Sequence, residues 1–511
     1  MPKANVRRRG VGSPEPSPVV KTGWPERLEA TSRTTGSATR YIHPMPLTPE
    51  ALTLAPILVL VIVLWVTEAL PLAVTALLGA VLCVVAGVAP AKDVFRPFAD
   101  PLIFLFIGSF LLAEAIRLHG LDRRLAYRVL SVPWIGERPT RILAAVALVS
   151  VLISAFISNT VTAAMMMAIV TGILGAVEAA ACVHGKPPAP TFATSLFLCV
   201  AFAASIGGLA TPIGTPPNLI GLAFIRDQVG VHVSFLGWCA IGIPIVAVMT
   251  TVAVAVLSRL FPAGVERLEG VGSYVAAERG RLGAWTVAQK SVAFAFAITV
   301  FLWVMPGLLL ILLGAAHPIC GWLSKRLPEG VVALVGAILL FLLPGNHDGN
   351  GRRRRALEWR EARIDWDIVL LYGGGMALGE LCFSTGLAGV IGQSITGWIP
   401  SGDWSGPVLV AVATVVAVVT SEFTSNTASA NMVVPVVIAL ARATGVDPLM
   451  AALAATFASS IGFMMPVSTP CNALVYGSGR VPLRAMMSSG AIIDVIGVIT
   501  VTAAMLLASR F

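Results

Sequence analysis

Two copies of the tripeptide Ser-Asn-Thr lie inside long apolar stretches of the sequence, at residues 158–160 and, 267 positions later, at residues 425–427. At membrane depth, irregular backbone survives only where protein or a water-filled cavity satisfies it. A helical hairpin that turns at Ser-Asn-Thr meets this condition, and its tip leaves carbonyl and N–H groups free. Such oxygens can ligate Na⁺, and helix N-termini can hold a carboxylate. Ser154 and Ser421 lie one helical turn before each tip, so we expect their hydroxyls to face the same place.

Each tripeptide is followed by a second polar interruption that contains proline and asparagine. The first reads Thr215-Pro216-Pro217-Asn218 and the second reads Thr469-Pro470-Cys471-Asn472. Because proline removes a backbone donor and disrupts the preceding turn, each pattern predicts a helix broken near mid-membrane. Gly214 and Ser468 immediately precede these breaks and can present carbonyl oxygens to an ion.

Neither pair of motifs is adjoined by lysine or arginine. A dianion bound between them would therefore be neutralised by helix dipoles, hydroxyls, amides and co-bound Na⁺. We expect the binding of anion and of Na⁺ to be strongly coupled, and two related half-sites suggest two or more sodium ions.

The composition identifies the elements that must position these motifs as membrane helices. Of the 511 residues, 57% are hydrophobic and only 12% are charged, about half the charged fraction of soluble domains. Uncharged runs of roughly 20 residues recur along the chain, the length that spans the hydrocarbon core. Apolar segments are expected at residues 51–69, 70–90, 101–118, 143–175, 192–225, 235–261, 291–314, 329–345, 367–391, 408–443, 448–479 and 485–510.

Lysine and arginine are unevenly distributed between the connecting segments. They concentrate in residues 117–141, 259–290 and 352–363, whereas residues 387–407 contain neither. The positive-inside rule places the basic segments in the cytoplasm. Residues 1–50 are polar and basic with no apolar run, which is typical of a disordered tail. The net charge of +9 is scattered over short loops without aromatic interleaving, so nucleic-acid binding is not expected.

The two halves of the chain repeat one another. Besides both motif pairs, Leu70-Pro71 recurs as Leu327-Pro328, each followed by an Ala-Leu-Leu/Val-Gly-Ala pattern. Five crossings plus one re-entrant element in each half would turn the second half upside down, as in transporters built from inverted repeats. We therefore expect an all-α membrane protein with a first repeat at 51–261, a cytoplasmic linker at 262–290 and a second repeat at 291–511.

The chain resembles the divalent anion/sodium symporter family, whose members carry dicarboxylates, citrate or sulfate. The resemblance runs from about residue 51 to the C-terminus. It rests on the run from Leu64 to Pro71 (Leu-Trp-Val-Thr-Glu-Ala-Leu-Pro), on both Ser-Asn-Thr motifs, and on the polar pattern from Ser459 to Asn472. It implies a homodimer in the plasma or inner membrane whose transport domain moves like an elevator against a fixed scaffold.

The resemblance also implies the site residues. One sodium site would use Ser154, Ser158, Asn159 and Gly214, and the other would use Ser421, Thr424, Asn426 and Ser468. The substrate would meet both hairpin tips and the following breaks, at Ser158, Asn159, Thr160, Thr215, Ser425, Asn426, Thr427, Thr469 and Pro470. In this sequence Cys471 stands where many relatives have proline.

A sodium-coupled importer of a C4-dicarboxylate is the leading hypothesis. An antiporter of the same fold without Na⁺ coupling and a symporter of sulfate or citrate remain open, because the tips suit any small dianion. An intramembrane enzyme would need a catalytic dyad or metal cluster at depth, and the six histidines form no His-Glu-x-x-His motif. A channel is disfavoured, because broken helices in both halves build a site that can be occluded.

Overall fold

The computed structural model describes residues 48–510, except 185–187, 315–316, 348, 350, 396–401 and 403. Most of the tail predicted over residues 1–50 therefore lies outside the described residues. Ten helices in the described chain are long and apolar enough to cross a membrane. The all-helical membrane architecture expected from composition is thus confirmed.

The first half folds into helices that follow the predicted apolar segments closely. They are α1 (Pro49–Thr67), α2 (Leu72–Val85), α3 (Ala91–Phe95), η1 (Arg96–Ala99), α4 (Pro101–Leu118), α5 (Leu121–Leu130), α6 (Pro139–Ser154), α7 (Asn159–His184), α8 (Pro190–Gly207), α9 (Pro216–Phe224), the π-helical segment η2 (Ile225–Val229) and α10 (Phe235–Leu260).

The predicted linker contains the short helix α11 (Val271–Arg281). The elements that follow it are α12 (Val287–Leu313), α13 (Pro318–Arg326), α14 (Glu329–Leu342), strands β1 (Pro344–His347) and β2 (Arg353–Arg355), η3 (Trp359–Glu361), α15 (Trp366–Ser384), α16 (Leu387–Ile395), α17 (Ser405–Phe423), α18 (Asn426–Thr444), α19 (Pro448–Ala458), α20 (Pro470–Gly477) and α21 (Leu483–Ala508). The two strands form an antiparallel hairpin.

Proline and small polar residues set where many helices begin. Pro101 and Pro448 occupy the first positions of α4 and α19, where a missing N–H costs nothing. The carboxylates of Asp100 and Asp447 cap these same helices by accepting the N–H groups of the second helical residue. Local residues thus determine where these two helices begin, and packing of their apolar faces provides most of their stability.

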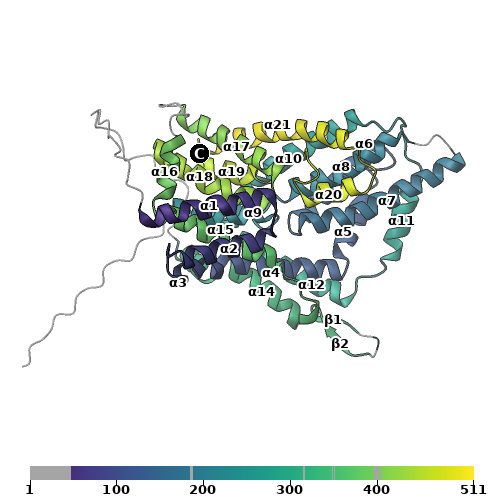
Figure 1. Cartoon of the computed structure of the whole chain (residues 1–511). Helices are drawn as coiled ribbons and strands as arrows, with labels where there is room; N and C mark the ends of the chain where they lie inside the picture. Colours follow the sequence, from purple (N-terminus) through teal and green to yellow (C-terminus); the bar gives the residue numbers. More distant parts are fainter. Residues whose placement is uncertain are drawn as a thin grey trace, which may run out of the picture. The chain divides into compact units, whose positions relative to one another are not determined.

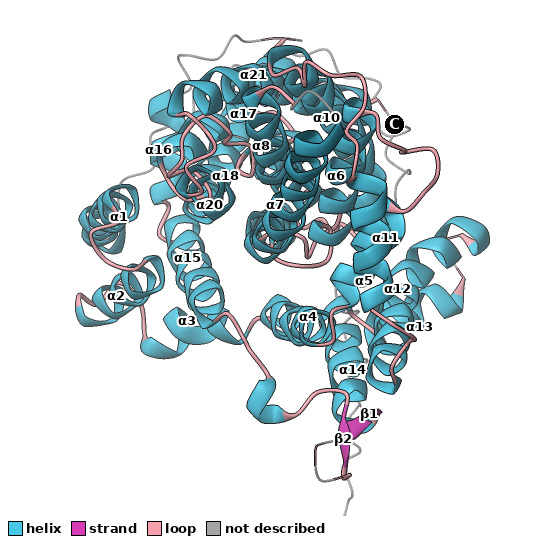
Figure 2. Cartoon of the chain, turned by 90° about the vertical axis from the view of Figure 1, so that its right-hand side faces the viewer, coloured by secondary structure: helices cyan, strands magenta, loops and turns pink. Residues whose placement is uncertain are grey.

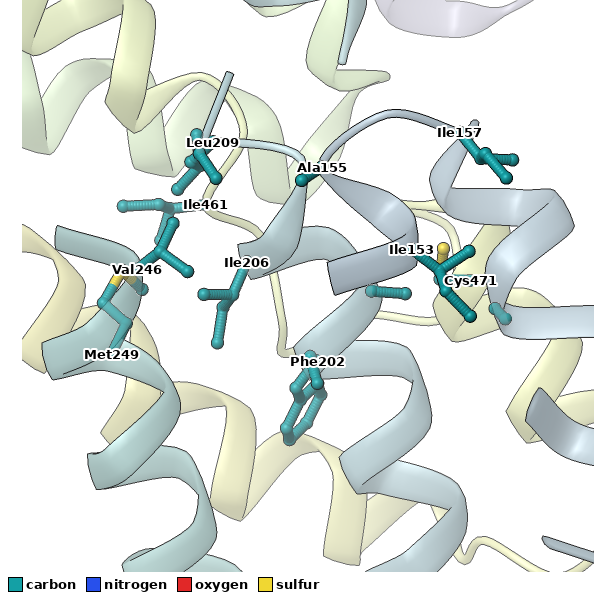
Figure 3. Close-up of a cluster of buried hydrophobic side chains, with 14 of the residues drawn as sticks. Ile153, Ala155, Ile157, Phe202, Ile206, Leu209, Val246, Met249, Ile461 and Cys471 are labelled. Atoms are coloured by element: carbon teal, nitrogen blue, oxygen red, sulfur yellow. The ribbon is translucent and has the colours of Figure 1, made fainter. Parts of the chain in front are cut away.

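Two groups of helices can be distinguished in the view of Figure 2. The hairpin bundle contains α6–α10 and α17–α21, and the frame contains α2, α4, α12, α14 and α15. The core of the hairpin bundle draws on both halves of the chain, since Ile206, Val246 and Ile461 gather in one cluster (Figure 3). The rings of Phe202 and Phe463 also meet edge to face, with centroids 5.3 Å apart.

The predicted turns at Ser-Asn-Thr are present as two helical hairpins. Helix α6 packs against α7 and helix α17 packs against α18. The end of the first hairpin away from its tip lies beside the start of α11. There Leu268 N–H donates to Glu137 O, and Gly270 packs on Ala176. The open end of the second closes at Gly406, which packs on Val446. Figure 1 shows the α6–α7 and α16–α18 regions at opposite sides of the view.

The basic connecting segments meet one another, as expected if they face one compartment. Helix α5 packs on α11, and Arg124 donates to the carbonyl oxygens of Leu282 and Gly283. The β-hairpin joins the same region, because Ser291 donates to Pro344 O at 2.7 Å. The α5 and α11 helices themselves were not predicted, since their polar sequences carry no membrane-span signal.

The three glycines of residues 373–375 allow close helix packing. A Cβ atom added to Gly374 would lie 2.6 Å from Ala76 of α2, and one added to Gly375 would lie 1.8 Å from the Asn431 amide oxygen of α18. Gly379, one turn later, would meet Phe224 of α9 at 2.2 Å. Helix α15 therefore packs through its bare backbone on α2 of the frame and on α9 and α18 of the hairpin bundle.

Candidate sodium and anion site

The first hairpin tip is built around a buried serine. Helix α6 ends at Ser154, whose hydroxyl is fully buried and donates a 2.6 Å hydrogen bond to the carbonyl oxygen of Ala204 in α8. After a four-residue turn, Asn159 opens α7. The tip is thereby tied to the end of α8, the helix that breaks before α9.

The side-chain amide of Asn159 faces three oxygen atoms. One of its terminal atoms lies 2.6 Å from Ser154 Oγ, 3.2 Å from Ala204 O and 3.3 Å from Gly214 O. Hydrogen bonding alone favours the amide nitrogen at this position, because nitrogen donates and the facing oxygens accept. If the amide oxygen occupies this position instead, it lies close to the oxygens of Ser154, Ala204 and Gly214, so four oxygens gather in one place. That donor set suits a hard cation such as Na⁺.

Asn218 closes the break between α8 and α9. Its side-chain amide donates to the carbonyl oxygens of Gly208 and Thr211, each at 2.9 Å, and it is fully buried. The loop is so tight that a Cβ on Gly208 would lie 2.6 Å from the Asn159 amide oxygen, and one on Gly214 would lie 2.4 Å from Gly208 O. Glycine is therefore required at both positions for the loop to reach the tip.

The second tip repeats the first. Ser421, also fully buried, lies with its Oγ 2.7 Å from the Asn426 amide oxygen and donates to Ser459 O at 2.8 Å. Asn472 takes the place of Asn218, donating to Gly462 O at 3.2 Å and Met465 O at 3.0 Å. A serine–asparagine contact thus closes each tip, and an asparagine that donates to two backbone carbonyl oxygens closes each break.

The remaining residues of the second predicted sodium site lie around this tip. Ser468 is buried and donates to Gly462 O at 2.8 Å, and a Cβ on Gly462 would lie 3.3 Å from Ser421 Oγ. Thr424 is also buried, but its hydroxyl donates to Thr420 O within α17. The hydroxyl keeps its lone pairs after donating, so either it or the backbone carbonyl of Thr424 can offer an oxygen to an ion.

The predicted substrate residues at the tips present uncommitted hydroxyls. Ser158 is exposed, and Thr160, Ser425 and Thr427 are partly exposed. Within the described residues none of these four hydroxyls has a hydrogen-bond partner, and Ser425 begins α18 without a side-chain cap. Free hydroxyls beside the first N–H groups of a helix form a ready site for a carboxylate or sulfate oxygen.

The breaks add two further helix N-termini with buried threonines. Thr215 begins α9 without a side-chain cap, whereas Thr469 caps α20 by accepting the Asn472 N–H at 3.0 Å. Pro470, the first residue of α20, is exposed. Helix α9 packs on α18 and helix α20 packs on α7, so each break lies against the hairpin of the other half.

Sequence reasoning missed two buried acids beside the second tip. Glu422 follows Ser421 directly, and Asp494 lies within α21, each with 5% of its surface exposed. An ionisable residue inside a membrane span is a functional candidate by default. That rule applied to the apolar segments would have singled out both side chains.

The fold and these two tips define a polytopic membrane transporter. The model of the family described as the sodium:sulfate symporter transmembrane region matches residues 41–509. The chain belongs to this family, and the resemblance to sodium-coupled anion symporters is confirmed.

Two relatives support the same conclusion. A sodium-dependent dicarboxylate transporter of Staphylococcus saprophyticus, SdcS, is 32% identical over 446 residues, covering 86% of this chain and 82% of the relative. The SdcS protein of Staphylococcus aureus is 31% identical over 472 residues, covering 90% and 86%. The protein is thus a sodium-dependent secondary transporter of the plasma membrane, not an enzyme.

Two solved transporters share the fold at low sequence identity. MtrF of Neisseria gonorrhoeae superimposes with a TM-score of 0.55 at 12% identity, covering 90% of this chain and 95% of MtrF. YdaH of Alcanivorax borkumensis gives a TM-score of 0.50 at 14% identity, covering 80% and 85%. At such identities the likeness concerns the fold alone.

Proposed function

We propose that the protein imports a C4-dicarboxylate together with Na⁺. The observation that carries this proposal is the Asn159 amide, which faces the Ser154, Ala204 and Gly214 oxygens and has a counterpart at Asn426. The names of the SdcS relatives supply the substrate class. A dicarboxylate suits two tips that each offer free hydroxyls beside a helix N-terminus, one for each carboxylate.

The sodium ions act as co-substrates that make the site neutral. No lysine or arginine adjoins the tips in the sequence, so an incoming dianion meets only dipoles, hydroxyls and amides. One Na⁺ at Ser154, Ser158, Asn159 and Gly214 and another at Ser421, Thr424, Asn426 and Ser468 would cancel two negative charges. Anion affinity then depends on sodium occupancy, which is the thermodynamic basis of coupled transport.

An elevator movement of the hairpin bundle against the frame would carry this site across the membrane. The halves form inverted repeats in this proposal. Equivalent contacts in the two halves support it: Ser421 bonds within the second half as Ser154 does within the first, and Asn472 bonds as Asn218 does. The glycine face of α15 offers a smooth surface for sliding. The homodimer expected from the family resemblance remains a prediction, which the mass of the detergent-solubilised protein tests.

Substrate competition in proteoliposomes tests the proposed substrate. Uptake of labelled succinate under an inward Na⁺ gradient should be reduced by excess unlabelled malate or fumarate and little by sulfate or citrate. Inhibition by sulfate alone would favour a sulfate symporter of the same architecture. Uptake that requires internal dicarboxylate and ignores Na⁺ would instead identify an antiporter.

A further inference from the structure

An arginine of the hairpin bundle forms an ion pair with an aspartate of the frame. Arg226 lies in η2, directly after α9, and Asp100 immediately precedes α4. Arg226 Nη2 donates to Asp100 Oδ2 at 2.6 Å, and Nη1 donates to Oδ1 at 3.3 Å. The two side chains are only 28% and 14% exposed. A two-pronged guanidinium–carboxylate pair that is largely shielded from water is among the stronger polar contacts in proteins.

The frame fixes the carboxylate of this pair. Asp100 Oδ1 accepts the Leu102 N–H at 2.8 Å and thereby caps α4. The same oxygen accepts the hydroxyl of Tyr372 in α15 at 3.0 Å, and Tyr372 is fully buried. Because α4 and α15 both belong to the frame, Asp100 cannot move with the hairpin bundle without giving up these two bonds.

The hairpin bundle fixes the guanidinium. The η2 segment packs on α9 and α19. Within η2, Arg226 Nε donates to Asp227 Oδ1 at 2.6 Å. Arg442 of α18 also holds η2, because it donates to Gln228 O. The bond from Arg226 to Asp100 therefore crosses from one group of helices to the other.

The loop after η2 meets the frame a second time. His232 Nε2 lies 3.6 Å from Oε2 of Glu329, the first residue of α14. The beginnings of α14 and α4 adjoin each other, since a Cβ on Gly330 would lie 2.5 Å from Pro101 O. Both contacts therefore lie at the same end of the frame. Because α4 and α14 each lead into a basic connecting segment, the positive-inside rule places this end on the outer side of the membrane.

We propose that the Arg226–Asp100 pair is a latch that holds the hairpin bundle in the position seen in the structure and opens in each transport cycle. The inference rests on the proposed elevator movement of the bundle against the frame. An ion pair lasts only while its nitrogen and oxygen atoms lie within about 4 Å of each other, so a bundle that slides past α4 must break it. The latch lowers the free energy of one position alone, and it therefore sets the ratio between the two positions of the bundle.

Asp100→Asn opens the latch and spares the frame. The amide oxygen can take the place of Oδ1, where it accepts the Leu102 N–H and the Tyr372 hydroxyl. The NH₂ group then faces Arg226, which is also a donor. Arg226 keeps Asp227 as its partner in this variant. Arg226→Gln removes the opposite charge, and Arg226→Lys keeps the charge but loses the two-pronged geometry.

Asp447→Asn is the matched control. Asp447 caps α19 by accepting the Leu449 N–H at 3.0 Å, and Pro448 follows it as Pro101 follows Asp100. In the part of the chain that the structure describes, no lysine, arginine or histidine pairs with Asp447. The substitution thus makes the same chemical change at the start of a bundle helix without touching the latch.

The test measures the distance between two spin labels by pulsed electron paramagnetic resonance in proteoliposomes. One label is attached to Cys182 of α7, the one cysteine of the seven that is exposed. The other is attached to Lys92→Cys in α3, which packs on α2 and α15 of the frame. Labelled protein is diluted with unlabelled protein, so that only labels within one chain are measured.

The wild type should show two distances whose ratio responds to Na⁺ and succinate. Asp100→Asn and Arg226→Gln should shift this ratio about tenfold away from the position seen in the structure, the effect of losing a hydrogen bond between charged groups. Arg226→Lys should shift the ratio less, and Asp447→Asn should leave it at the wild-type value.

Two results would overturn the latch while the elevator movement stands. If Asp100→Asn and Arg226→Gln lower the melting temperature but leave the ratio of distances unchanged, the pair only stabilises the fold. If Asp447→Asn shifts the ratio as much as Asp100→Asn, the shift does not come from the ion pair. Should Asp100→Asn fail to fold, Arg226→Gln and Arg226→Lys still decide the matter.

Failure of the proposed function has a different signature. If neither the wild type nor any variant shows a second distance although Na⁺ drives succinate uptake, the elevator movement fails, and the latch fails with it. If the wild type shows two distances but takes up no succinate with Na⁺, the proposed substrate or coupling ion is wrong. The effect of Asp100→Asn on the ratio then still tests the latch.

Discussion

Ser154 and Asn159 meet across the first hairpin tip, with the serine Oγ 2.6 Å from the asparagine amide. The serine ends one helix and the asparagine begins the next, so one contact closes the turn. The serine hydroxyl faces Ala204 O, and the asparagine amide faces both Ala204 O and Gly214 O. Ser421 and Asn426 repeat this relationship at 2.7 Å. Each tip thus gathers oxygen atoms around one asparagine amide.

Asn159→Ala should weaken Na⁺ binding far more than it changes folding. Losing one ligand of a buried cation costs about 1.5–3 kcal/mol, so the Na⁺ concentration for half-maximal succinate uptake should rise about tenfold or more. Titration of uptake with Na⁺ in proteoliposomes measures this. The control is Thr171→Ala, which removes an exposed threonine from the same helix α7. If uptake by the two variants depends on Na⁺ concentration in the same way, Asn159 is not a sodium ligand.

Gly214→Ala should abolish sodium-driven uptake while a matched glycine tolerates the same change. The new methyl group would lie 2.4 Å from Gly208 O, a backbone atom that cannot yield without moving the loop. Gly175→Ala in α7 meets nothing within 4 Å and should transport normally, with a gain in helix stability of up to about 1 kcal/mol. Wild-type uptake by Gly214→Ala would show that the loop geometry does not matter for sodium.

A disulfide between α15 and α18 should stop transport if the hairpin bundle slides on the frame. Gly375 faces Asn431 so closely that cysteines at both positions are within bonding reach. Oxidation of the double variant should remove uptake, and reduction should restore it. The single Asn431→Cys variant and the reduced double variant serve as controls, because a side chain at Gly375 would collide with an intact Asn431. Unchanged uptake in fully cross-linked protein would mean that these helices stay together throughout the cycle.

His232 should make stability depend on pH. The Glu329 carboxylate, which forms an ion pair with His232 at 3.6 Å from Nε2, raises the pKa of His232 above its ordinary value of 6.5. A raised pKa in the folded state stabilises the protein below pH 6.5, and this contribution is lost as the pH rises through the folded-state value. The melting temperature in detergent should therefore fall over that range. The fall should be smaller in His232→Gln, and an identical pH profile for both proteins would rule out this ion pair.

The sequence predicted the parts of the site that depend on local chemistry. Repeated Ser-Asn-Thr inside apolar runs favours a turn, and the Pro-containing interruptions favour a break followed by a new helix, so the tips and breaks followed from residue types. The exact partners of Ser154 and Ser421 could not be predicted, because Ala204 and Ser459 contribute backbone carbonyls that any residue possesses. Helices α5 and α11 could not be predicted because their sequences are polar and tertiary contacts stabilise them.

The most direct test of the whole account is succinate uptake into proteoliposomes with Na⁺ outside and K⁺ inside, for the wild type and for Asn159→Ala and Asn426→Ala. The account predicts accumulation above equilibrium in the wild type, none when choline replaces Na⁺, and a severe loss in both variants. Equal uptake in Na⁺ and choline, with both asparagine variants fully active, would contradict it.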